Sequence, residues 1–97
     1  MTDLATLELA AFVPLVGETF RLNTDEGNID LVLHEAQALG LSPRPGGAFS
    51  LVFRAPQDQP VAQQLHPIHH PALGSMHLFL LPIGSVGDDL AYEAILT

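Results

Sequence analysis

The sequence contains no cysteine, no lysine and no tryptophan. The missing cysteine excludes disulfides and thiolate chemistry, and the missing lysine excludes Schiff-base chemistry. Three arginines oppose eleven acidic residues, which gives a net charge of −8. That charge repels phosphate backbones and anionic membrane surfaces. We therefore expect a protein partner, with no nucleic acid and no membrane.

The chain is short, and it also lacks any long apolar run. Its 97 residues fit one domain, 1–97, and 47% of them are hydrophobic. No apolar run approaches the roughly 20 residues of a membrane-spanning helix. The N-terminus, Met1-Thr2-Asp3, has no basic region of the kind that opens a signal peptide. These features favour a cytoplasmic protein.

Periodicity predicts one short helix followed by strands. Leu4 to Phe12 fits a helix capped at Thr6, with Glu8 in its first turn, and Pro14 is expected to end it. Beyond this segment the apolar pattern has a period of two, separated by turn residues at intervals of about ten. We expect strands at residues 18–23, 29–35, 48–54, 61–66, 77–83 and 90–96, and a linker over 36–47. The predicted fold class is mainly β: a small antiparallel β-sandwich or barrel of about six strands.

Residues 59–87 contain no Asp, Glu, Lys or Arg. Within them, the run Leu78, Phe79, Leu80 and Leu81 is apolar on both faces of a strand, which predicts burial on both faces. Pro82 lacks a backbone N–H, so the strand is expected to end there or to lie at a sheet edge. Either the N-terminal helix covers this segment or another subunit does, and in the second case these four residues form an interface.

The same uncharged stretch holds the only histidine cluster, which is the one candidate metal site: His66, His69, His70 and His77. Neutral imidazoles bind zinc, but this spacing matches no established ligand pattern. His69 and His70 are adjacent, so on an extended chain they point to opposite faces. Two prolines are expected to kink the segment. We predict no metal site, no cofactor and no catalytic residue here.

No motif of a nucleophile elbow or of a phosphate-binding loop is present either. The sequence therefore predicts a protein that is not an enzyme.

Several short pieces that together span nearly the whole chain match one known pattern: Phe12-Val13-Pro14 with Gly17 and Phe20, Leu31 and Leu33 with Glu35, Phe49 to Arg54 with Pro56, His70 with Leu73-Gly74, Leu78 to Leu80 with Pro82 to Gly84, and Tyr92 to Ala94. Through these pieces the chain resembles a family of short bacterial all-β domains of unknown function. The segment Gln63 to His66 departs from the family pattern. The resemblance implies a fold and no activity. Members accompany phage-tail-collar-like proteins, which implies a role in an assembly.

Two functional hypotheses follow. The first is a non-enzymatic structural or protein–protein interaction module that self-associates or joins a larger assembly. The alternative is a β-barrel domain that binds a small molecule or a metal through the clustered histidines.

Overall fold

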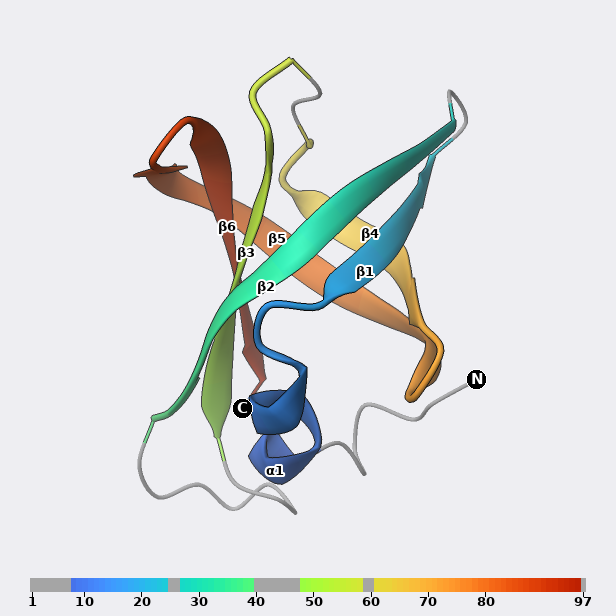
Figure 1. Ribbon diagram of the computed structural model, residues 1–97, viewed down its shortest axis with the longest axis vertical. Helices are drawn as coiled ribbons and strands as arrows, with labels where there is room; N and C mark the ends of the chain where they lie inside the picture. The colour runs from blue at the N-terminus through green and yellow to red at the C-terminus, as the bar shows by residue number, and fades with distance from the viewer. Residues whose placement is uncertain (1–7, 25–26, 40–47, 59–60, 97) are drawn as a thin grey trace.

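Six antiparallel strands form a closed barrel in the computed structural model, which describes residues 8–24, 27–39, 48–58 and 61–96 (Figure 1). The strand order around the barrel is β1-β2-β3-β6-β5-β4. The strands are β1 (Thr19–Thr24), β2 (Gly27–Ala38), β3 (Phe49–Pro56), β4 (Gln64–His70), β5 (Gly74–Val86) and β6 (Asp89–Leu96). The expected six-stranded antiparallel fold is confirmed, as a barrel and not as a sandwich.

The N-terminal helix is shorter than predicted. It consists of α1 (Leu9–Phe12) followed by the 3₁₀ helix η2 (Val13–Leu15). Glu8 takes the N-cap position without a side-chain hydrogen bond, and the expected cap Thr6 lies outside the described residues. Pro14 does not end the helical segment but sits in the first turn of η2, where a missing N–H costs nothing. In the described part of the chain, neither helix is long and apolar enough to cross a membrane.

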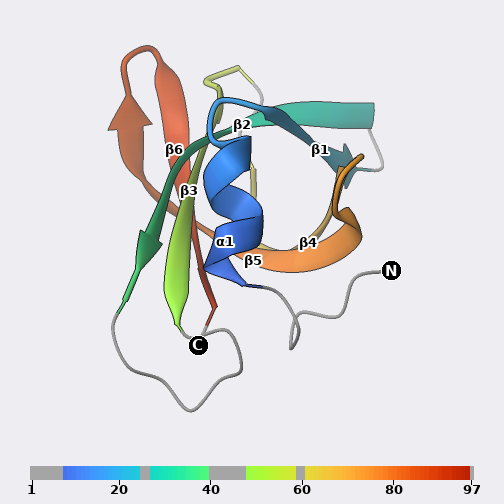
Figure 2. The same ribbon diagram turned by 60° about the horizontal axis from the view of Figure 1, so that its bottom comes forward.

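Every strand contributes its inward-facing side chains to the interior of the barrel. Phe49, Leu51 and Phe53 of β3 are fully buried, as their period-two spacing predicts. Helix α1 lies across one end of the barrel (Figures 1 and 2) and places Phe12 inside, with its ring centroid 5.6 Å from that of Phe49. Four of the five phenylalanines belong to this core. The fifth, Phe79, does not.

Strands β2, β4 and β5 extend furthest beyond their predicted limits. Strand β2 continues to Ala38, into the segment expected to be a linker, and residues 40–47 of that segment lie outside the described residues. Strand β4 starts at Gln64 and not at Val61, and it runs straight through Pro67. Strand β5 runs from Gly74 to Val86 and does not end at Pro82. Pro67 is one of the two prolines expected to kink the histidine segment, and Pro82 was expected to end its strand or to lie at a sheet edge.

Pairing explains why both prolines fit. Strand β4 pairs with β5 only up to Leu80, so Pro82 lies where β5 pairs with β6 alone. A bulge follows at once, between Pro82 and Gly84. Pro67 similarly lies immediately before Ile68 and His69, the two residues of β4 that pair with β1, so it lies where β4 pairs with β5 alone. A proline is tolerated at a local edge because one side of the strand needs no donor there.

Tyr92 ties the loop before β4 to the core. Its ring is buried, and its hydroxyl oxygen accepts a hydrogen bond of 2.9 Å from the backbone N–H of Val61. We predict that Tyr92→Phe lowers the free energy of unfolding by about 1–3 kcal/mol, because a buried donor is left without a partner. Denaturant unfolding measures this loss. Ser85→Ala, an exposed hydroxyl removal, is the control, and equal stability of the two variants would contradict the assignment.

Candidate functional site

The apolar segment of β5 is divided between the two sides of the barrel wall. Leu78 and Leu80 are inside, with 2% and 0% of their surface exposed. Phe79 and Leu81 point outward and remain 50% and 36% exposed. The structure therefore corrects the expectation of burial on both faces, and it also corrects the alternative in which the N-terminal helix covers the segment, because that helix lies at the barrel end. For Phe79 and Leu81 the interface stays a prediction.

The outward residues of β5 belong to a larger apolar surface. Leu65 on β4 lies directly across from Phe79, and Ile95 on β6 lines the same hollow as Phe79 and Leu81. Leu65 and Ile95 are 56% and 54% exposed. We call these four residues the outer apolar face. It crosses three neighbouring strands, so the barrel wall holds it in a fixed geometry.

A single acidic residue lies in this face. Glu93 is directly opposite Leu81 in the β5–β6 pairing, and it is half-buried. Together with Phe79, Leu81 and Ile95 it lines a surface hollow of about 110 Å³. The ion pairs within the described residues are Arg54–Asp89 and His70–Glu18, so Glu93 forms none there. A half-buried carboxylate among apolar side chains is a point at which a cation would be stabilised.

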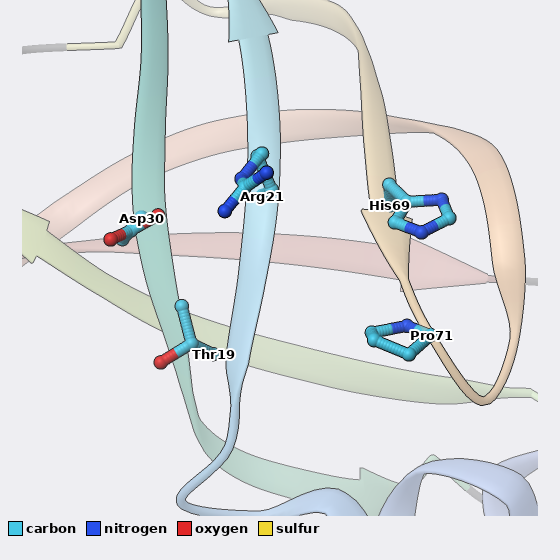
Figure 3. Close-up of a pocket in the computed structure, with 5 residues that line it drawn as sticks. All are labelled: Thr19, Arg21, Asp30, His69 and Pro71. Atoms are coloured by element: carbon cyan, nitrogen blue, oxygen red, sulfur yellow. The ribbon is translucent and has the colours of Figure 1, made fainter.

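A second, more polar hollow lies on the outside of β1, β2 and β4 (Figure 3). It has a volume of about 290 Å³ and is lined by Thr19, Arg21, Asp30, His69 and Pro71. Arg21 is the direct cross-strand neighbour of both Asp30 and His69, so the three outward side chains form one row across three strands. The hollow begins where β1 and β4 stop pairing, beyond Arg21 and His69.

The four clustered histidines lie on both sides of the barrel wall, two inside and two outside. His66 and His70 are buried, whereas His69 is exposed and His77 is half-buried. The predicted opposite directions of His69 and His70 are confirmed. Within the described residues, no three histidine, aspartate or glutamate side chains come together as a metal-binding group.

Each of three histidines contacts a nearby polar group. His66 Nε2 lies 2.7 Å from the carbonyl oxygen of Ala62, so this nitrogen carries the proton and donates. His69 Nδ1 lies 3.3 Å from the hydroxyl of Ser75. His70 Nε2 lies 2.9 Å from Oε1 of Glu18. These contacts fix local structure around β4.

His70 has both ring nitrogens occupied. Its Nδ1 accepts a 3.0 Å hydrogen bond from the backbone N–H of Ala72, so the ring proton sits on Nε2 and is donated to Glu18. The ring also packs on Phe20, with 4.6 Å between ring centroids. The pair resembles a catalytic histidine–carboxylate dyad in composition only, since the second nitrogen is held by the backbone.

Sequence reasoning missed several residues of both hollows. Glu93 and Ile95 were placed on a strand, but nothing connected them to Phe79. Their outward direction could have been predicted, because they alternate along β6 with the buried residues Tyr92, Ala94 and Leu96. The row of Arg21, Asp30 and His69 had no such signal, since it depends on which strands are neighbours.

We predict that His70→Ala lowers the free energy of unfolding by about 2–4 kcal/mol, through the lost ring packing and the unpaired Ala72 N–H. Glu18→Gln keeps an oxygen acceptor for Nε2, so its expected cost is below about 1 kcal/mol. Denaturant unfolding compares the two. Equal losses would contradict the structural role of the ring, and an NMR measurement showing a proton on Nδ1 would contradict the assigned tautomer.

No curated protein and no solved structure matches this chain. One family model matches residues 7–96, which includes all six strands and both helices, and its description is a domain of unknown function, DUF6916. Because the match covers nearly the whole chain, the protein belongs to the DUF6916 family of domains of unknown function.

Proposed function

We propose that this domain is a non-enzymatic protein–protein interaction module that self-associates through the outer apolar face. The observation that carries the proposal is the exposure of Phe79. It is the one phenylalanine outside the core, and it stands among Leu65, Leu81 and Ile95. Contiguous exposed apolar side chains on a small soluble domain are typical of contact surfaces.

The energetics favour a covered face. Burying apolar surface contributes about 25 cal/mol per Å², so each half-exposed large side chain gains on the order of 1 kcal/mol when a partner covers it. The strands β4 and β5 also lie within the uncharged stretch 59–87, so no charged side chain of their own has to lose its water there. A domain of this size has a limited core and benefits from additional burial.

The closed barrel determines how such a contact is made. Each of the six strands pairs with a neighbour on both sides for at least part of its length. In an open sheet, an edge strand can form hydrogen bonds with a strand of another subunit. Such edge-to-edge pairing is disfavoured here. We infer that subunits meet by side-chain packing of barrel faces.

The arrangement of the histidines supports a non-enzymatic role. A general base needs a ring nitrogen directed at its substrate. His70, which among the described residues is the histidine in contact with a carboxylate, has both nitrogens engaged within the domain. Arg54 is likewise occupied by Asp89, at 3.3 Å.

We predict that the wild-type protein has a mass above the 10.4 kDa monomer at high concentration and that Phe79→Asp returns it to the monomer. A buried carboxylate without a partner opposes association. Light scattering after size exclusion, over a concentration series, measures both. Leu80 is unsuitable for this test because it is fully buried in the core.

Val16→Asp is the matched control. Val16 is 45% exposed and lies outside the face, in the turn after η2. This variant should associate like the wild type. A wild-type protein that stays monomeric at all concentrations, or a Phe79→Asp variant that associates normally while folded, would overturn the proposal.

A further inference from the structure

Glu93 restricts how two copies can meet. It lies inside the outer apolar face, half-buried beside Phe79, Leu81 and Ile95. A two-fold contact centred on this face would bring the Glu93 carboxylates of both copies into one dry interface, where like charges repel strongly. A stable contact between copies needs a cation opposite Glu93. In a chain without lysine, the side chains that carry a permanent positive charge are the arginines.

Only one described arginine is available for this contact. Arg44 lies outside the described residues, and Arg54 is held by Asp89. Arg21 is exposed, and within the described part of the chain it has no ion pair, although Asp30 is its direct neighbour on β2. A cation without an ion pair among the described residues is conspicuous in a protein with a net charge of −8.

The barrel places this cation and the acidic hollow far apart. Arg21 is on β1 and Glu93 is on β6. In the strand order β1-β2-β3-β6-β5-β4, two strands separate β1 from β6 in either direction around the barrel. Both side chains point outward, so they lie on opposite sides of the molecule. One copy therefore cannot pair them, whereas two successive copies can.

We propose, as a deepening of the proposed function, that copies of this domain join head to tail, with Arg21 of one copy entering the hollow beside Glu93 of the next. The arginine stem packs on Phe79 and Leu81, and the guanidinium reaches the carboxylate of Glu93. The ring of Phe79 also offers a face to the cation. The hollow beside Arg21, near Pro71, leaves room for the half-exposed side chains of the opposing apolar face.

A head-to-tail contact leaves one free Arg21 surface and one free Glu93 surface at the two ends of every open assembly. Such heterologous contacts build open chains or rings, unlike a two-fold contact, which stops at the dimer. We therefore expect the wild-type mass to rise past two subunits as the concentration increases. A mass that saturates at the dimer would contradict the head-to-tail arrangement.

Charge reversal tests the pairing directly. Arg21→Glu and Glu93→Arg should each weaken association at least about tenfold, because each places like charges together. Mixing the two variants should restore association, since the carboxylate introduced by the first substitution then meets the guanidinium introduced by the second. The native Arg21 of one variant likewise meets the native Glu93 of the other. Asp58→Arg, an exposed site with the same charge change as Glu93→Arg, is the control and should not dissociate the protein.

The outcomes separate this inference from the proposed function. If Phe79→Asp dissociates the protein but Arg21→Glu and Glu93→Arg associate like the wild type, the head-to-tail pairing is overturned and the apolar contact stands. Failure of the mixed variants to recover association also overturns the pairing. A wild-type protein that is monomeric throughout overturns both. Denaturant unfolding of each variant confirms that the exposed substitutions leave the barrel folded.

Discussion

Closure of the barrel between β1 and β4 is the constraint on which the remaining features depend. This seam is the shortest strand pairing, with Arg21 opposite His69 and Leu22 opposite Ile68. Side chains reinforce it, because His70 at the end of β4 packs on Phe20 of β1 and donates to Glu18 just before it. With the seam closed, alternate residues of every strand are assigned to the core or to the outside. An open seam would expose the apolar interior on both sides of the gap.

Closure also explains why apolar residues remain outside. The interior of a small barrel is filled by the inward half of each strand, and here four phenylalanines with their aliphatic neighbours occupy it. A strand that is apolar at consecutive positions must then present half of them to the exterior. In β5 these are Phe79 and Leu81, and neighbouring strands add Leu65 and Ile95. The outer apolar face thus follows from the sequence of β5 and the closed wall together.

The core strands were predictable from local pattern, and the site was not. The alternation of Phe49, Leu51 and Phe53 defines one buried face whatever the neighbouring strands are. The strand ends near Pro67 and Pro82 were predicted wrongly. A proline disrupts a strand only where backbone N–H donors are needed on both sides, and at these two positions each strand is paired on one side. Glu93 and Phe79 lie fourteen positions apart along the chain, and only the β5–β6 register brings them to one hollow.

The sequence alone determined an acidic, mainly β chain, the order and approximate places of its six strands, the uncharged stretch and the absence of cysteine and lysine chemistry, because these follow from composition and from the period of the apolar residues. Tertiary structure decided that the sheet is a closed barrel and not a sandwich, that Leu78 and Leu80 are core residues while Phe79 and Leu81 are not, and that Arg21 and Glu93 face opposite sides. The physical reason is that a period of two specifies two faces of a strand, whereas strand order and closure specify what each face meets.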